Sequence, residues 1–122
     1  MLPILICNSD KRLNRYLRRV LTEEGYEVEA TFDVMDAIHR ILTRRYRTLI
    51  LELSTDGMDE IEALPIINKI DGQLPIVTVT DDESLETQRI ARREKIFYYL
   101  IKPIDSKEII EVVKAAMHKS RM

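Results

Sequence analysis

Short apolar runs recur along the chain, and each is followed by a longer stretch in which apolar residues return every three or four positions. The first run, residues 2–7, is dense enough in aliphatic side chains to be a strand buried on both faces, as strands of a parallel sheet are. Residues 26–31 alternate apolar and polar positions, which is typical of an edge strand. Further strands are predicted over residues 48–53, 74–80 and 96–101.

The intervening stretches carry the spacing and the boundary signals of amphipathic helices. Asp10 is a favourable N-cap for a helix over residues 11–24, and Gly25 favours the end of that helix. Asp33 caps a second helix, whose predicted apolar face consists of Val34, Ala37, Ile38, Ile41 and Leu42. Further helices are predicted over residues 59–70, 84–94 and 106–119.

Two of these predicted helices have features that should make them shorter, bent or less firmly packed. Pro65 lies inside residues 59–70 and predicts a kink or a shorter helix, because proline lacks the backbone N–H that helices require. Residues 84–94 have a thin apolar face of Leu85, Ile90 and Ala91, so this helix is expected to be the least firmly docked.

Five strands that alternate with five helices imply right-handed crossovers and a parallel sheet covered on both faces. We therefore predict a three-layer, doubly wound α/β fold of the (βα)5 kind, with residues 1–122 forming one domain. Strand order 2-1-3-4-5 is the natural arrangement for this alternation. Ligands of such sheets bind at the carboxyl edge, so the residues that close the strands are the candidates for chemistry.

Three polar residues close apolar runs, namely Glu52, Thr80 and Lys102, and Lys102 is followed by Pro103. Because the carboxyl ends of parallel strands converge on one edge of the sheet, these residues are expected to meet although they are far apart in sequence. A carboxylate, a hydroxyl and an ammonium group would then share one pocket.

Composition limits the class of protein. With 122 residues, 45% hydrophobic and 33% charged, and a formal charge of −2, the chain has the profile of an ordinary globular domain, and its near-neutral balance argues against direct nucleic-acid binding. Charge is unevenly spread, since residues 49–86 carry ten acids and one base, whereas residues 87–122 carry nine bases and four acids.

The single cysteine and the apolar runs bear on location. Cys7 lies in an apolar run, which indicates a buried structural thiol and a reducing compartment. No signal-peptide pattern opens the chain and no stretch approaches the ~20 apolar residues of a membrane span. These features predict a cytoplasmic protein without a membrane partner.

Together, Glu52, Thr80 and the Lys102–Pro103 pair resemble the receiver domain of two-component response regulators, a flavodoxin-like fold that accepts a phosphoryl group on an Asp. The resemblance extends over the whole chain and includes the stretch LELSTDGMDE, which looks like the family's acceptor strand and loop. It implies that Glu52 occupies the phosphoacceptor position, that Thr80 contacts the phosphoryl oxygen, and that Lys102 pairs with acceptor or phosphate. It also implies a cis Lys102–Pro103 bond.

The chain departs from the family at the metal site. Receivers usually place two acids directly after the first strand to hold Mg²⁺, and here these positions are Asn8 and Ser9. Asp10 is adjacent and is a weak candidate ligand, but one carboxylate and two neutral groups make a poor site for a hard dication. The alternative interpretation is that all three residues form a helix-capping turn. His39 and His118 fall on separate predicted helices and suggest no metal cluster.

Two further positions leave alternatives open. Asp81 stands where receivers often keep a small residue, so its carboxylate either repels an incoming phosphate or turns outward to cap the next helix. Tyr99 matches the aromatic residue that changes rotamer on activation in the family, or it is a packed strand aromatic beside Phe97 and Tyr98.

These positions lead to a hypothesis for the pocket. Glu52 and Lys102 are expected to form a metal-independent ion pair, so that one permanent state replaces a phosphorylation switch; a simpler interpretation makes Glu52 an exposed strand-end acid. No cofactor is then expected. The alternative is a weakly active receiver that accepts a phosphoryl group on Glu52 or Asp56 and uses Asp10 at a reduced Mg²⁺ site.

The predicted function is therefore that of a signalling and protein-interaction module, a degenerate receiver that is not an enzyme. Its partners are expected to be a histidine kinase or a downstream effector, and two copies could also pair through the same face. That face combines the fourth helix, fifth strand and fifth helix and carries Arg89, Arg92, Arg93, Lys107 and Lys114. A nucleotide- or flavin-binding protein of similar architecture is disfavoured, because no Gly-rich loop follows the first strand.

Overall fold

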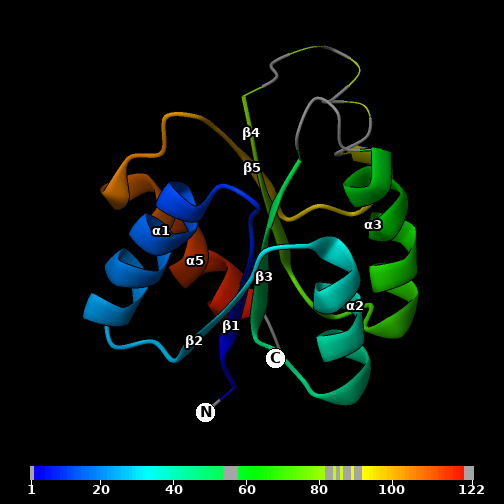
Figure 1. Ribbon diagram of the computed structural model, residues 1–122, viewed down its shortest axis with the longest axis horizontal. Helices are drawn as coiled ribbons and strands as arrows, with labels where there is room; N and C mark the ends of the chain where they lie inside the picture. The colour runs from blue at the N-terminus through cyan, green and yellow to red at the C-terminus, as the bar shows by residue number, and fades with distance from the viewer. Residues whose placement is uncertain are drawn as a thin grey trace.

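The computed structural model describes residues 2–53, 58–81, 84, 86, 89 and 92–119. Within them, a parallel sheet has the strand order β2-β1-β3-β4-β5, which confirms the predicted fold class and topology (Figure 1). Its strands are β1 (Ile4–Cys7), β2 (Val28–Thr31), β3 (Thr48–Glu52), β4 (Ile76–Thr80) and β5 (Tyr98–Ile101). The alternating strand over residues 26–31 is indeed at an edge of the sheet.

Helices cover both faces of this sheet. The described helices are α1 (Lys11–Glu23), α2 (Val34–Thr43), α3 (Met58–Ile70) and α5 (Ser106–Lys119). In Figure 1, α1 and α5 lie on one side of the sheet and α2 and α3 lie on the other. Most of the predicted helix over residues 84–94 lies outside the described residues. The residues of this segment that are described as helical are Glu86, Arg89, Arg92 and Arg93.

The predicted helix boundaries rest on identifiable capping contacts. The Asp10 carboxylate accepts hydrogen bonds from the backbone N–H groups of Arg12 and Leu13, and the Asp33 carboxylate accepts one from Asp36. Gly25 has a φ of 92°, a left-handed conformation that glycine adopts without steric cost at the end of α1.

Some sequence predictions are corrected. Pro65 does not shorten α3, which runs from Met58 to Ile70, because Ala63, Leu64 and Ile67 on either side of it are buried and tertiary packing outweighs the missing N–H. Leu42 does not join the buried face of α2 but is exposed. Four strands begin two residues later than predicted, and β3 ends one residue earlier.

Two apolar clusters, one on each face, hold the sheet between its helices. Alternate residues of the central strands point to opposite faces, so Leu49 and Leu51 pack with α2 and α3, whereas Ile50 packs with α1 and α5. All of β1, β3 and β4 is buried. Their carboxyl ends form a fixed edge for polar residues. Across the described part of the chain, no helix is both long and apolar enough to cross a membrane.

Candidate functional site

Glu52 is the last residue of β3, the central strand of the sheet, and only 6% of its surface is exposed. A buried carboxylate loses much of its hydration and needs hydrogen-bond donors or a cation to remain charged. The interpretation of Glu52 as an exposed strand-end acid is therefore wrong.

Both carboxylate oxygens of Glu52 have partners. Lys102 Nζ donates to Oε2 at 2.9 Å and forms an ion pair with it. Ser9 donates twice to Oε1, from its backbone N–H at 3.1 Å and from Oγ at 2.9 Å. The predicted ion pair is confirmed, and Ser9 adds two donors to it. The carboxylate is thus held between residues that follow β1 and β5.

The neighbouring strand β4 fixes the position of Lys102. The backbone N–H of Lys102 donates to the carbonyl of Thr80 at 2.8 Å, which continues the pairing of Thr80 with Ile101 beyond the end of β5. Thr80 is buried, and the Lys102–Pro103 peptide bond is cis as predicted. The structure therefore brings Glu52, Thr80 and Lys102 to the same edge of the sheet.

Asn8 and Asp10 form the predicted capping turn. The Asn8 side-chain oxygen accepts from the backbone N–H of Asp10 at 2.9 Å, and the exposed Asp10 carboxylate caps α1. The other polar atom of the buried Asn8 amide, Nδ2, is a hydrogen-bond donor. It has no hydrogen-bond partner among the described residues.

These residues do not fit a Mg²⁺ site. A hard dication requires several oxygen ligands, yet the Asn8 side-chain oxygen accepts from Asp10, an Asp10 oxygen caps the helix, and the Glu52 oxygens accept from Ser9 and Lys102. No group of three or more His, Cys, Asp or Glu side chains suited to a metal ion occurs among the described residues.

Asp81 and Tyr99 flank this edge. Asp81 is exposed, in agreement with an outward orientation, while the helix start that it was expected to cap lies outside the described residues. Tyr99 is half-buried and its ring stacks on that of Tyr98 with centroids 6.5 Å apart, as a packed strand aromatic would. Asp56, the alternative acceptor, also lies outside the described residues.

Asn14 is a structural contributor that the sequence reasoning missed. This buried residue of α1 donates both amide protons, one to the Asn8 carbonyl at 3.0 Å and one to the Thr31 carbonyl at 3.1 Å. It therefore fastens α1 to the ends of β1 and β2 beside the pocket. The available signal was an amide on the apolar face of a helix, three positions before Leu17.

Cys7 lies at the end of β1, immediately before Asn8, and is buried as predicted. Burial, together with the nearby carboxylates of Asp33, Glu60 and Glu52, raises the pKa of its thiol to about 12. The thiol is therefore protonated at neutral pH and is not a nucleophile of the pocket.

The predicted partner face is basic where the structure describes it. Exposed basic side chains are contributed there by Arg89, Arg92, Arg93, Lys107 and Lys114. Two of them have acidic neighbours, since Arg89 lies 3.7 Å from Glu86 and Arg93 pairs with Glu94 at 2.9 Å.

Comparison with known proteins places this geometry in a family. Residues 4–114 match the Response regulator receiver domain family. The curated protein Response regulator ArlR from Staphylococcus aureus is 28% identical over 121 residues, which cover 98% of this chain and 54% of ArlR. The chain therefore spans about half the length of the curated relatives that it matches.

Solved structures agree with this match. A CheY-like response regulator receiver domain protein from Methanospirillum hungatei has a TM-score of 0.91 at 22% identity, over 98% of this chain and 95% of that chain. A two-component response regulator from Clostridium difficile has a TM-score of 0.87 at 26% identity, over 97% of each chain. With the family match extending over most of the chain and the flavodoxin-like topology in agreement, this protein belongs to the response regulator receiver domain family.

Proposed function

We propose that this chain is a signalling and protein-interaction module of the receiver family in which a permanent Glu52–Lys102 ion pair replaces the phosphorylation switch. The observation that carries the proposal is the 2.9 Å contact between Lys102 Nζ and Glu52 Oε2, at the positions that the family uses for lysine and phosphoacceptor. In this interpretation Glu52 is not phosphorylated in the usual way, and the module acts by binding other proteins.

Charge balance supports a metal-independent pocket. A receiver pocket with three carboxylates and one lysine has a net charge of −2, which a divalent cation neutralises. In this pocket Asn8 and Ser9 are neutral, Asp10 is committed to α1, and Glu52 and Lys102 sum to zero. The two neutral residues, Asn8 and Ser9, therefore remove the charge of −2 that a divalent cation would neutralise.

The contacts of Glu52 also oppose nucleophilic attack. Ser9 and Lys102 hydrogen-bond to both carboxylate oxygens and so lower the reactivity of their lone pairs. The side chain is longer than that of Asp by one C–C bond, roughly 1.5 Å. A displacement of this size alone costs on the order of 10²-fold in rate.

The second candidate function is a weakly active phosphoacceptor that uses Glu52 or Asp56 with Asp10 at a reduced Mg²⁺ site. The family membership favours it, because receivers as a class accept phosphoryl groups. The capping role of Asp10 speaks against it.

One experiment separates the two functions. The purified chain is incubated with acetyl phosphate and Mg²⁺, and the intact protein is weighed. We expect no phosphoryl mass increment. An increment that either Glu52→Ala or Asp56→Ala abolishes would refute the proposal and identify that residue as the acceptor.

Matched variants locate the cause. The triple variant Asn8→Asp, Ser9→Asp, Glu52→Asp restores the family's acids, and we expect it to gain a Mg²⁺-dependent increment. Glu52→Asp alone should remain unmodified, because it restores the nucleophile without the metal ligands.

The partner interaction is part of the proposal. We assign docking of a histidine kinase or a downstream effector in the cytoplasm to the face formed by residues 84–94, β5 and α5, whose exposed arginines and lysines steer an acidic partner. Pairing of two copies through this face is a further prediction from the sequence. Among the described residues of the face, Tyr98 is the single large hydrophobic side chain that is exposed.

A further inference from the structure

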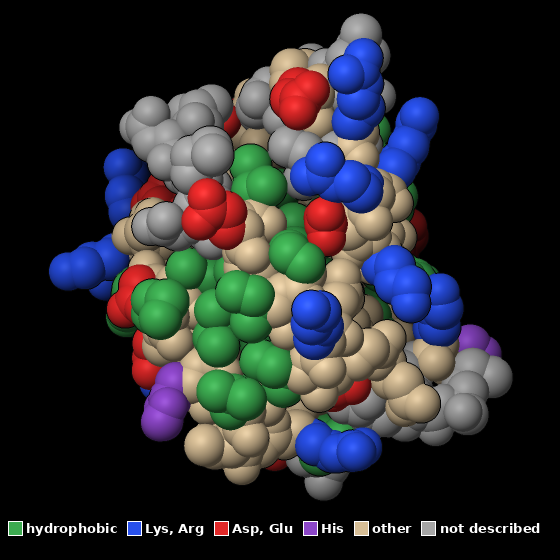
Figure 2. All heavy atoms as spheres, turned by 90° about the vertical axis from the view of Figure 1, so that its right-hand side faces the viewer, with side chains coloured by type: hydrophobic (Ala, Val, Ile, Leu, Met, Phe, Trp, Pro, Cys, Tyr) green, Lys and Arg blue, Asp and Glu red, His purple; other side chains and the backbone are tan. Residues whose placement is uncertain are grey.

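Large hydrophobic side chains are exposed on the side of the sheet opposite α5, over α2 and α3. Met35 and Leu42 of α2 are 71% and 62% exposed, and Ile66 of α3 is 48% exposed. Figure 2, which faces this side, shows hydrophobic side chains gathered into one patch with charged groups around it. Apolar side chains grouped in this way mark an interaction surface more often than scattered ones do.

The patch follows the helical repeat on both helices. On α2, Met35, the half-buried Ile38 and Leu42 are spaced three and four residues apart and therefore share one stripe. On α3, Ile66 lies four residues after Glu62 and three before Lys69, and both charged residues are exposed. The outer stripe of α3 therefore reads acid, apolar, base along about 10 Å of helix.

This order is self-complementary. A two-fold axis across the helices and near Ile66 places α3 antiparallel to its own copy, as an isologous interface requires. Glu62 of each copy then faces Lys69 of the other, so one ion pair forms twice, while Ile66 meets Ile66 between them. The apolar stripe of α2 lies antiparallel to its own copy in the same arrangement. Glu62 and Lys69 make no ion pair within the described part of a single copy, so both are available.

We propose that the α2–α3 face binds a second copy of this chain, in an antiparallel two-fold dimer with Ile66 near the axis. Both the charges and the apolar residues of this face match those of its own copy. This favours a second copy over an unrelated partner, whose surface would have to match the outer stripe of α3 by coincidence. The interface lies on the far side of the sheet from α5 (Figure 1) and therefore leaves the exposed lysines of α5 accessible.

The size of the face sets the expected affinity. Two adjacent helices offer a surface of roughly 20 by 20 Å, so the two copies together bury about 800 Å², which is below the area of stable interfaces and in the range of weak, transient ones. We therefore expect a reversible dimer with a dissociation constant of roughly 10–500 µM. Sedimentation velocity of the chain over that concentration range measures it. A wild-type chain that stays monomeric throughout overturns the proposal.

Charge reversal tests the antiparallel register. Glu62→Lys and Lys69→Glu each turn both symmetric ion pairs into repulsions and should weaken the dimer about tenfold or more. The double variant Glu62→Lys, Lys69→Glu restores opposite charges across the axis and should return the affinity to within about threefold of wild type. The double reversal is unfavourable for the α3 helix dipole, so a purely structural role predicts greater instability and no rescue. A double variant no tighter than the singles refutes the register.

Apolar contact is tested at the axis, with a control on α1. Ile66→Asp places two carboxylates against each other and should abolish association in the measured range. Arg15→Glu changes an exposed side chain of α1, outside both faces, and should leave association unchanged. Dimers that survive Ile66→Asp but are lost in Lys107→Glu, a variant of the α5 face, overturn the proposal. Thermal unfolding of each variant confirms that the monomer is folded.

Discussion

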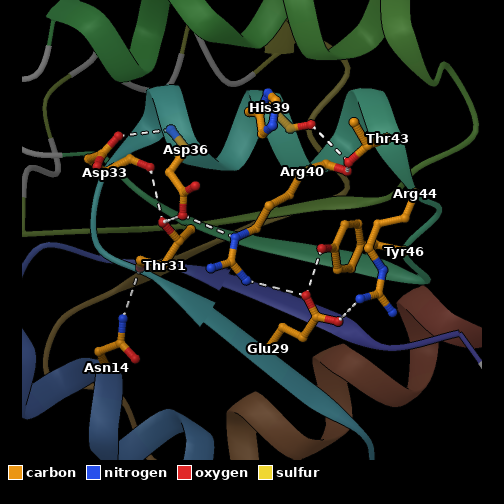
Figure 3. Close-up of polar contacts among 10 residues, drawn as sticks. All are labelled: Asn14, Glu29, Thr31, Asp33, Asp36, His39, Arg40, Thr43, Arg44 and Tyr46. Atoms are coloured by element: carbon orange, nitrogen blue, oxygen red, sulfur yellow. Dashed lines mark hydrogen bonds and ion pairs between the residues drawn. The ribbon is translucent and has the colours of Figure 1, made fainter.

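Glu52 and Glu29 both accept hydrogen bonds from several donors, but they differ in the number of cations that contact them and in where those cations lie in the sequence. Glu52 closes the central strand β3, and its side-chain partners among the described residues are one cation, Lys102, and one hydroxyl residue, Ser9. Glu29 lies on the edge strand β2, where Arg40, Arg44 and Tyr46 converge on its carboxylate (Figure 3).

The donors around Glu29 come from a single neighbourhood. Arg40 belongs to α2, and Arg44 and Tyr46 follow it within a few residues, so the cluster ties the end of α2 to the edge of the sheet. Arg40 also contacts Asp36, which in turn accepts a hydrogen bond from Thr31. This hydrogen bond and Arg40 hold the pKa of Asp36 below its usual value.

The difference teaches which glutamate can act as a site. Two arginines and a tyrosine from one short segment contact the Glu29 carboxylate, so loss of any one of these side chains leaves the other two in place. Glu52 depends on one cation and joins segments that lie 43 and 50 residues away in sequence. Only the second arrangement makes a single residue decisive for the state of a pocket.

Removal of Lys102 is the strongest test of this contrast. Lys102→Ala should lower the free energy of unfolding by about 2–3 kcal/mol, because buried Glu52 loses its one cation; the value lies below that of a fully buried pair since the lysine side chain is 26% exposed. Urea denaturation measures it. Lys107→Ala, an exposed lysine of α5, is the matched control and should cost under ~0.5 kcal/mol. Equal losses for the two variants would mean that the pair contributes nothing.

Tyr46 tests the second cluster and adds a pH dependence. Tyr46→Phe removes the 2.8 Å hydrogen bond to Glu29 and should cost about 1–2 kcal/mol at neutral pH, because both arginines remain. Burial, together with the hydrogen bond and charge of Glu29, raises the pKa of Tyr46 to about 12.

The sign of this pH effect follows from linkage. The native state keeps the Tyr46 proton to a higher pH than the unfolded chain, whose tyrosine pKa is about 10. Its contribution is therefore complete below pH ~10 and is lost as the pH rises toward the native value of about 12. Denaturation curves should show wild type losing its advantage over Tyr46→Phe across this interval. An advantage that stays constant would contradict the raised pKa.

The smallest effect is expected at Arg44. Its side chain is 50% exposed, and Arg40 and Tyr46 still contact Glu29 without it. Arg44→Ala should therefore cost no more than ~0.5 kcal/mol plus any lost contact with the Tyr46 ring. A loss as large as that of Lys102→Ala, in the same denaturation assay, would erase the distinction between the two glutamates.

Much of the fold and part of the site could be predicted from the sequence, because both depend on patterns along the chain. Strand density and helical spacing gave the order of elements, and the rule that strand ends converge gave the Glu52–Lys102 contact. Asp10 and Asp33 were recognisable as caps since capping is local.

Contacts that depend on side-chain direction could not be predicted. Whether Ser9 turns toward Glu52, or Asn14 reaches two strand ends, is decided by the register of neighbouring elements rather than by residue type. The Glu29 cluster was missed for the same reason, because alternation marks the exposed and buried faces of an edge strand but not the partners on them. The helix around Pro65 was not shortened as predicted, because helix propensity is a weak prior against packing on both sides.

The Glu52–Lys102 contact determines how long the state of the pocket lasts. A phosphoryl group is added and removed, so the signal that it carries lasts for a shorter time than the protein itself. An ion pair between two residues of one chain forms when the chain folds and persists for the lifetime of the native state. In the proposed function, information can then be conveyed only by how many copies the cell makes and by which partners occupy them.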